Sequence, residues 1–173
     1  MKNVVDFDVI SINGGRSDNV ITPSCTAELV TKDSKTLNTL FFSYLLDVKK
    51  EISSRERDFS FELNINESSE FQALTDECAA AIIKLLACSP QGVVQMSTEI
   101  EGLVETSLNL GVVSTKNDNF QVCYALRSSK ATALDALKEK MYSYGSLFGA
   151  TVTSDGKYPP WEYVSNSELQ ALY

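Results

Sequence analysis

Hydrophobic and polar residues alternate in three stretches of the chain, as they do in strands that bury one face. Residues 4–12 alternate up to a turn-forming Asn-Gly-Gly at residues 13–15, and residues 26–31 resume the alternation after a polar loop. Together these stretches predict a hairpin with a long connection. Residues 59–66 alternate strictly, which predicts a further strand.

Three other segments carry apolar residues three and four positions apart, the spacing of one helical stripe. Ser34 precedes the first stripe as a candidate N-cap. Pro90 and Gly92 follow the second stripe, and Gly149 follows the third in the position of a C-terminal cap. The stripes run from Leu37 to Ile52, from Phe71 to Leu86 and from Leu134 to Phe148.

Residues 93–128 lose the helical spacing and gain β-branched residues and turn signals. They predict two antiparallel strands, at 108–114 and 120–126, on either side of an Asn/Asp turn. Residues 151–153 predict a last short strand. Paired strands separated by helices, without regular βαβ alternation, predict an α+β fold: a two-layer sandwich whose mainly antiparallel sheet has helices packed on one face. We expect residues 1–173 to form a single domain.

The composition is that of a soluble globular protein. The 173 residues are 43% hydrophobic and 22% charged, with 8 Gly and 4 Pro, far from the profile of a disordered chain. A net charge of −8 would repel a phosphate backbone, so nucleic acid is not an expected partner. No apolar run approaches the roughly 20 residues that span a bilayer, and the N-terminus lacks the build of a signal peptide, so a membrane partner is not expected either.

The sequence contains no histidine. This removes Ser/His/Asp and Cys/His nucleophilic machinery, the usual imidazole base and every zinc site with a His ligand. The four cysteines, at 25, 78, 88 and 123, match neither a redox pair nor a zinc ribbon. Their apolar or small neighbours predict buried, unreactive thiols in a reducing cytosol.

Two positions are candidate ligand contacts. Asn19 lies on the polar loop after Gly14-Gly15, where a carboxamide can donate to a ligand carbonyl or to a developing oxyanion. Arg127 follows the strand at 120–126, and a guanidinium at a strand's end can hold a carboxylate by two parallel hydrogen bonds. The alternatives are an ordinary hairpin loop and a surface Arg in a weak ion pair.

Two further features have structural explanations. Glu99, Glu101 and Glu105 form a carboxylate cluster, but the spacing fits no calcium loop, and a solvated acidic face is the expected reading. Trp161, beside Pro159-Pro160, is an aromatic that either anchors a partner or locks the chain against the core. We favour the structural role.

Six strings of residues also occur in a characteristic order, and they resemble, in that order, the lid domain of the aminoacyl-histidine dipeptidases (Xaa-His dipeptidase, peptidase D), in the dinuclear zinc peptidase group. The set covers nearly the whole chain, with the weakest similarity over 32–80, and residues 104–113 are the most specific match. The strings are Asn13-Gly-Gly-x-x-x-Asn19-Val-Ile, Leu85-Leu-Ala-x-x-Pro90-x-Gly-Val-Val, Gly102-Leu-Val-Glu-Thr-Ser-Leu-Asn-Leu-Gly-Val-Val113, Leu126-Arg127-Ser128, Leu147-Phe-Gly-Ala150 and Gly156-x-Tyr-Pro-x-Trp161.

The resemblance implies a two-domain enzyme. Its catalytic domain holds two zinc ions, and its inserted, ferredoxin-like lid mediates dimerisation and helps bind the dipeptide. In the family, a Gly-Gly-His-Ser-Gly segment and a helix precede the strand that matches residues 4–12, and this sequence begins after both. We therefore expect a fragment that lacks the first strand and helix of the lid, with no cofactor of its own.

Two residues carry over from the family by position. Asn19 matches the Asn of the family's Gly-Gly-x-x-x-Asn-Ala-Ile-Pro loop, which implies a hydrogen bond to the substrate or the tetrahedral intermediate, within one chain or across a dimer. Arg127 matches the lid Arg that holds the substrate's C-terminal carboxylate. After Asn19 the sequence departs from the family: Val20-Ile-Thr-Pro23-Ser replaces Ala-Ile-Pro-Arg-Glu, so the loop geometry is expected to differ.

The resulting hypothesis is the lid and dimerisation domain of a cytoplasmic zinc dipeptidase that hydrolyses Xaa-His dipeptides. The chain would supply substrate contacts but no zinc ligands and no catalysis of its own. Its partners would be the catalytic domain of the same parent chain, a second copy and the dipeptide. The alternative is a stand-alone α+β protein-interaction module derived from such a lid. A cysteine-nucleophile enzyme ranks far lower, because no His is present to activate a thiol.

Overall fold

The computed structural model describes residues 5–67, 70–116, 119–156 and 159. The chain divides into two compact units. Unit 1 comprises residues 1–12 and 27–79, and unit 2 comprises residues 13–26 and 80–173.

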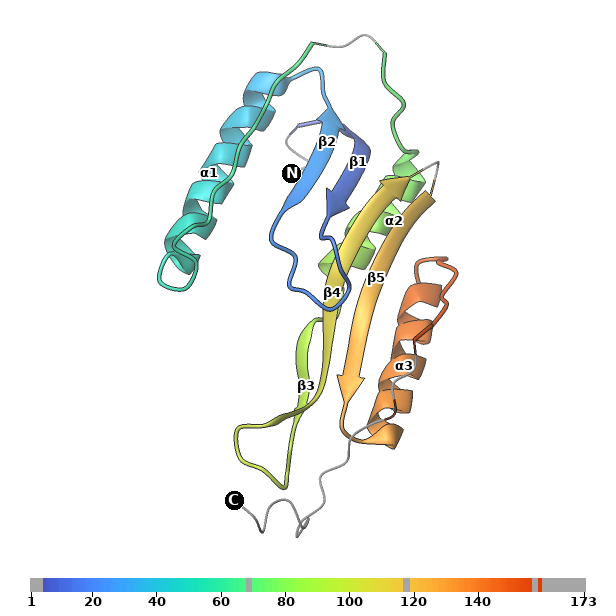
Figure 1. Ribbon diagram of the computed structural model, residues 1–173. Helices are drawn as coiled ribbons and strands as arrows, with labels where there is room; N and C mark the ends of the chain where they lie inside the picture. The colour runs from blue at the N-terminus through green and yellow to red at the C-terminus, as the bar shows by residue number, and fades with distance from the viewer. Residues whose placement is uncertain (1–4, 68–69, 117–118, 157–158, 160–173) are drawn as a thin grey trace. The chain divides into compact units, whose positions relative to one another are not determined.

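Strands and helices follow one another as an α+β chain with an open antiparallel sheet (Figure 1). The strand order is β2-β1-β4-β3, and β5 also pairs with β4. The predicted fold class and the predicted pairing of the first two strands are confirmed. The described elements are β1 (Asp8–Gly14), β2 (Cys25–Val30), α1 (Ser34–Ile52), α2 (Asp76–Ala87), β3 (Gly92–Met96), β4 (Val104–Lys116), β5 (Asn119–Ser128) and α3 (Ala131–Ser146).

The long strand β4 organises unit 2. Along one edge it pairs with β5 from Thr106 to Lys116. The other edge is shared by β3, which pairs with residues 104–108, and by β1, whose Gly14 pairs with Val113. The sequence pattern did not predict strand β3, because it did not separate these residues from their neighbours.

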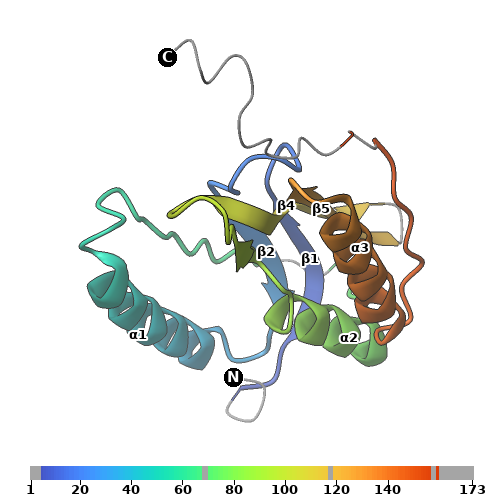
Figure 2. The same cartoon turned by 90° about the horizontal axis from the view of Figure 1, so that it is seen from below.

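Helix α3 covers one face of β4 and β5 (Figure 2). Leu108 from β4 packs with Leu137 and Met141 from α3, and the first two side chains are each only 4% exposed. Even-numbered residues of β5, Tyr124 and Leu126, pack against this cluster. Since successive side chains of a strand point to opposite faces, the odd-numbered residues of β5 face away from α3.

Two tyrosines tie the second helix to this face. The Tyr144 hydroxyl on α3 donates to the Leu85 carbonyl near the end of α2. The hydroxyls of Ser89 and Tyr124 lie 2.7 Å apart in a hydrogen bond. Burial, followed by the neighbouring Tyr124, raises the pKa of Tyr144 to about 12. Within unit 2 the helical segments therefore lie on one face of the β4–β5 pair, as predicted.

In unit 1, α1 is an amphipathic helix with a half-buried stripe and no fully buried residue. Phe41 and Phe42 on this helix make edge-to-face contacts with the Phe61 ring, at centroid distances of 6.1 and 5.6 Å. Such contacts stabilise aromatic clusters beyond simple burial. The predicted stripe is present, although Tyr44 on it is exposed.

Two predicted strands are wrong. Residues 59–66 and 151–153 are extended but pair with no strand among the described residues. Phe61 packs on α1 instead, and Val152 lies over Gly145 of α3, where a Cβ would overlap its side chain. At Phe61 and Val152 the apolar side chain packs on a helix, and such packing can produce the same alternation as a half-buried strand.

The helix boundaries also differ in part from the prediction. Asp33, and not Ser34, caps α1 by accepting a hydrogen bond from the Thr36 N–H at 3.0 Å. Helix α2 begins only at Asp76, behind Thr75, whose hydroxyl accepts from the Cys78 N–H. Phe71 is therefore not helical. The end of the third helix is confirmed: the turn after α3 closes at Gly149 with φ +71°, a conformation that favours glycine.

The prediction of buried cysteines is wrong, because all four thiols are free and on exposed residues. Cys123 occupies an odd position of β5, on the face away from α3, and Cys78 stands next to the buried Ala79. Apolar neighbours indicate a nearby core but do not tell which position points into it.

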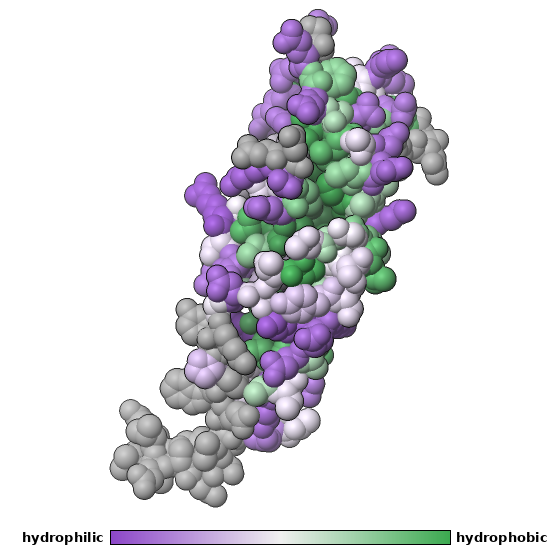
Figure 3. All heavy atoms as spheres, turned by 90° about the vertical axis from the view of Figure 1, so that its right-hand side faces the viewer, coloured by the Kyte–Doolittle hydropathy of each residue, from purple (hydrophilic) through white to green (hydrophobic). Residues whose placement is uncertain are grey.

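Some large hydrophobic side chains are exposed. Hydrophobic side chains reach the surface at several places, among them Ile65 in unit 1 and Ile21 and Leu147 in unit 2. One face of the molecule shows hydrophobic residues among hydrophilic ones (Figure 3). Of the helices in the described part of the chain, none combines the length and the apolar character that crossing a bilayer requires.

Candidate functional site

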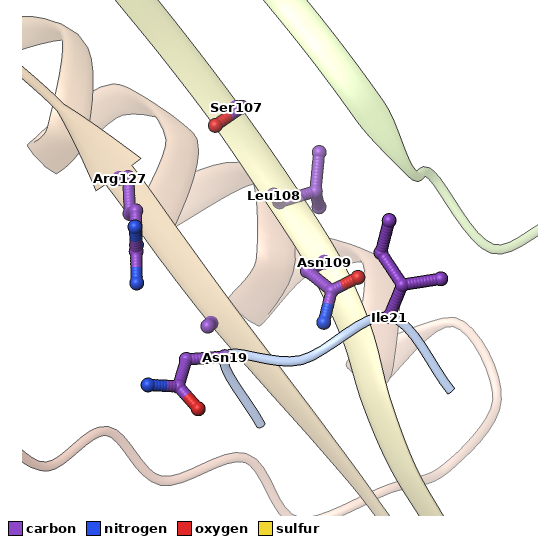
Figure 4. Close-up of a pocket in the computed structure, with 7 residues that line it drawn as sticks. Asn19, Ile21, Ser107, Leu108, Asn109 and Arg127 are labelled. Atoms are coloured by element: carbon purple, nitrogen blue, oxygen red, sulfur yellow. The ribbon is translucent and has the colours of Figure 1, made fainter. Parts of the chain in front are cut away.

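The face of β4 and β5 that points away from α3 carries a shallow pocket of about 170 Å3 in unit 2 (Figure 4). The strand register places Ser107 opposite Arg127 and Asn109 opposite Ala125. The small Ala125 side chain leaves room between the polar ones. The pocket is lined by Asn19, Ile21, Ser107, Leu108, Asn109, Ala125 and Arg127.

The structure therefore brings together the two residues that the sequence singled out. Asn19 comes from the loop between β1 and β2, and Arg127 from near the end of β5. Figure 4 shows both side chains beside the pocket, with the loop that carries Asn19 and Ile21 crossing the two strands. Both candidate residues are exposed, so their polar groups are available to a ligand.

The loop of residues 15–24 is fastened to β4 by side chains on both partners. Asn109 Nδ2 donates to the carbonyl oxygens of Asp18 and Val20 at 2.8 and 2.9 Å. The Thr22 hydroxyl donates to the Gly111 carbonyl at 2.8 Å. Asn19 thus sits on a segment that is hydrogen-bonded to β4 on both sides of it.

A β-bulge at Gly111 makes this close approach possible. Leu110 pairs with Tyr124 and Val112 with Cys123, so Gly111 is the extra residue. A Cβ on Gly111 would lie 2.5 Å from the Asp18 carbonyl carbon, where real contacts stay above 3.0 Å. Gly15, at φ +77°, approaches the Gly111 carbonyl from the loop side. Glycine on both sides allows the two backbones to touch.

The polar groups of the pocket differ in how they are engaged. Asn19 Oδ1 accepts a hydrogen bond from the Ser17 hydroxyl at 2.7 Å, which leaves the Asn19 Nδ2 to donate. Among the described residues, neither this nitrogen nor the Arg127 guanidinium has a hydrogen-bond or ion-pair partner. The alternative reading of Arg127, as one half of a surface ion pair, has no support in the described part of the chain.

This arrangement suits one end of a small anionic ligand. Arg127 presents a planar fork of donors that matches a carboxylate, and Asn19 adds a neutral donor beside it. Pockets that enclose a whole drug-sized ligand have roughly 300–1,000 Å3, more than the pocket observed. The site is therefore large enough for a carboxylate and its immediate neighbours, and the rest of a ligand would lie outside it.

Two of the free cysteines in unit 2 have raised pKa values. Burial, followed by the Asp18 carboxylate, raises the pKa of the Cys123 thiol. Burial also raises the pKa of Cys25. Both thiols are therefore held in the protonated form, which is the weaker nucleophile.

The acidic cluster is not a single solvated face. Glu101 is exposed, and Glu99 pairs with Lys130 at 2.9 Å. Glu105, however, is only 8% exposed, so the prediction is wrong for this residue. Its backbone carbonyl accepts from the Ser129 N–H, which anchors the start of β4 to the chain before α3. Trp161 lies outside the described residues.

Metal ligands are not assembled by the part of the chain that is described: no group of three or more His, Cys, Asp or Glu side chains there could hold an ion.

Sequence reasoning missed Asn109, Thr22 and Gly111 as parts of the site. All three act through the backbone of the loop. The signal was present in the Leu108-Asn-Leu110-Gly segment, where a polar residue and a glycine interrupt an otherwise apolar strand, a pattern typical of a bulge or a close backbone approach.

Comparisons with known proteins show what this chain is similar to. No family model matches the chain. The cytosol non-specific dipeptidase of Escherichia coli (strain K12) is 30% identical over 170 residues, which are 97% of this chain and 35% of that protein. The crystal structure of aminoacylhistidine dipeptidase from Vibrio alginolyticus matches with a TM-score of 0.88 and 28% identity, over 99% of this chain and 35% of the other.

The resemblance to the aminoacyl-histidine dipeptidases is confirmed. The chain spans 35% of the length of each of these two dipeptidases. It therefore corresponds to a section of such a protein, and its α+β fold is the fold of that section.

Proposed function

We propose that this chain is the lid and dimerisation domain of a cytoplasmic zinc-dependent dipeptidase that acts on Xaa-His dipeptides. In this proposal the chain contributes substrate contacts, and two zinc ions lie in a catalytic domain of the same parent protein. The observation that carries the proposal is the convergence of Asn19 and Arg127 on one pocket, since both positions match substrate-binding positions of the family.

The role of each residue follows from its chemistry. The Arg127 guanidinium binds the C-terminal carboxylate of the dipeptide through two parallel hydrogen bonds. Asn19 Nδ2 donates to a substrate carbonyl, or to the oxyanion that develops from it. The small volume of the pocket supports a site that grips one end of the dipeptide while the reacting bond lies outside this chain.

Kinetics of the longer enzyme test the assignment of Arg127. We expect Arg127→Ala to raise the KM for Xaa-His dipeptides, because it removes a charge-assisted contact worth about 1.5–3 kcal/mol. Arg16→Ala is the matched control, since Arg16 is also an exposed cation of unit 2 but does not line the pocket. Unchanged dipeptide kinetics in Arg127→Ala would refute the carboxylate contact.

The chain by itself should show no hydrolysis of Xaa-His dipeptides with added zinc, because the described residues assemble no metal site. Metal-dependent turnover by the purified 173-residue chain would contradict this. The flanking coding sequence gives an independent check: zinc-ligand motifs on both sides support the dipeptidase, whereas their absence would favour the stand-alone interaction module.

The proposed homodimer is tested by the molecular mass in solution. The family resemblance supports a second copy as a partner, with Asn19 acting within one chain or across the dimer. Light scattering of the longer enzyme should give twice the mass of one chain. A mass that stays monomeric at micromolar concentration would refute dimerisation.

A further inference from the structure

One amide group on β4 holds the backbone on both sides of Asn19. Asn109 Nδ2 donates to the carbonyl of Asp18, at 2.8 Å, and to the carbonyl of Val20, at 2.9 Å. These carbonyls belong to the residues immediately before and after Asn19. The side chain of Asn109 is half-buried and also lines the pocket.

The chemistry of this contact requires an amide at position 109. A primary amide carries two N–H donors on one nitrogen, so it can satisfy two carbonyls at once. A carboxylate of the same shape has only acceptors and would face two carbonyl oxygens. A serine hydroxyl has one donor, and an apolar side chain has none.

The other contacts between the loop and its neighbours lie farther from Asn19. Gly15 donates its N–H to the Ser24 carbonyl at 3.3 Å, and Thr22 bonds to the backbone at Gly111. Both contacts hold the ends of the loop. Within the loop itself, the Val20 N–H donates to the Ser17 carbonyl at 3.5 Å, and the Ser17 hydroxyl donates to Asn19 Oδ1 at 2.7 Å. The two hydrogen bonds from Asn109 join the residues on both sides of Asn19 to β4.

From this geometry we infer that Asn109 is a positioning residue that orients Asn19 toward the ligand bound by Arg127. The inference rests on the proposed function, because it assigns Asn19 a donor role in dipeptide binding. Without the two hydrogen bonds, the segment that carries Ser17 and Asn19 would no longer be held against β4, and the ligand would have to order it on binding.

The test uses two variants. Asn109→Asp keeps the shape of the side chain but removes its two N–H donors, and Asn109→Ala removes the whole amide group without adding a charge. Asn64→Asp is the matched control for the added charge, because Asn64 is exposed and lies in unit 1. Two readouts are taken: amide hydrogen exchange of residues 16–22 in the 173-residue chain, and the KM and kcat of the longer enzyme in a double-mutant cycle with Asn19→Ala.

We expect both Asn109 variants to speed exchange in the loop by about tenfold or more, while exchange in α3 stays unchanged. We expect each Asn109 substitution to raise KM about tenfold when Asn19 is present. In the Asn19→Ala variant, the same substitution should leave KM unchanged. In an Arg127→Ala background the effect should persist in full. The control Asn64→Asp should change neither readout.

Two results would overturn the inference. Unchanged loop exchange in both Asn109 variants would show that the contact does not hold the loop. A KM effect of the same size with and without Asn19 would show that Asn109 does not act through it. A failure of the proposed function has a different signature, because Asn19→Ala and Arg127→Ala would then leave dipeptide kinetics unchanged while the exchange result still stands.

Discussion

Gly111 is the point where the loop of residues 15–24 touches β4, and its replacement by Ala tests the architecture of the site. The added Cβ would overlap the Asp18 backbone, and backbone atoms cannot rotate away as the end of a flexible side chain can. The protein then has two responses. It keeps the loop in place with strain, or it releases the loop.

The hydrogen bonds of the loop set an upper limit on the free energy of unfolding that this substitution can cost. Releasing the loop breaks the two bonds from Asn109 and the one from Thr22, each worth about 1 kcal/mol. Keeping it costs the strain of overpacking, typically about 1–3 kcal/mol. Because the cheaper response sets the cost, we expect Gly111→Ala to lower the free energy of unfolding by about 1–3 kcal/mol.

Urea unfolding followed by circular dichroism measures this change, and a constant m-value shows that stability alone has changed. Adding Gly111→Ala to Asn109→Ala should cost less than adding it to the wild type, because the loop contact is already broken. Ser107→Ala, on the same strand, should stay within about 0.5 kcal/mol of wild type. If Gly111→Ala also stays within that range and leaves loop exchange unchanged, the close approach of loop and strand is wrong.

Two further predictions concern titrating groups. A hydrogen bond with Thr36 lowers the pKa of Asp33 below its usual value of 3.8. The ionised Asp33 therefore stabilises the fold at pH values above 3.8, and this stabilisation is lost as the pH falls through the folded-state pKa. The stability difference between wild type and Asp33→Ala should therefore shrink on acidification in urea titrations, and a difference independent of pH would contradict the cap. Since burial and then the Asp18 carboxylate raise the pKa of Cys123, Asp18→Asn should speed alkylation of this thiol at pH 8, followed by mass spectrometry, and an unchanged or slower rate would refute the effect of that charge.

At residues 59–66 the sequence pattern predicted which of the two phenylalanines' neighbours are exposed, but it did not predict what the segment packs on. Exposure alternates as expected around Phe59 and Phe61, but the Phe61 ring meets helix α1 and not a neighbouring strand. Alternation reports that one side of an extended segment is covered. It does not report what covers it, because that depends on residues far away in the sequence.

The two candidate residues of the pocket could be selected from the sequence, but the residues that hold the loop against the strand could not. Asn19 and Arg127 could be selected from their residue types and from the family resemblance. Their meeting at one pocket depends on the register that places Arg127 opposite Ser107 and on the bulge at Gly111. The glycine in the Leu108-Asn-Leu110-Gly segment is a signal for such a bulge, but it does not indicate which loop approaches the strand there. Asn109 looked like one polar position among others, because its partners are backbone carbonyls and not side chains.

The central claim is that Arg127 binds the terminal carboxylate of a dipeptide, and the most direct measurement compares a dipeptide with its C-terminal amide. For the longer enzyme, the amide should have a kcat/KM roughly 10- to 150-fold lower than the free acid, the equivalent of a contact of about 1.5–3 kcal/mol. In Arg127→Ala this preference for the acid should fall to near unity, while Arg16→Ala keeps it. A preference that survives unchanged in Arg127→Ala would contradict the account.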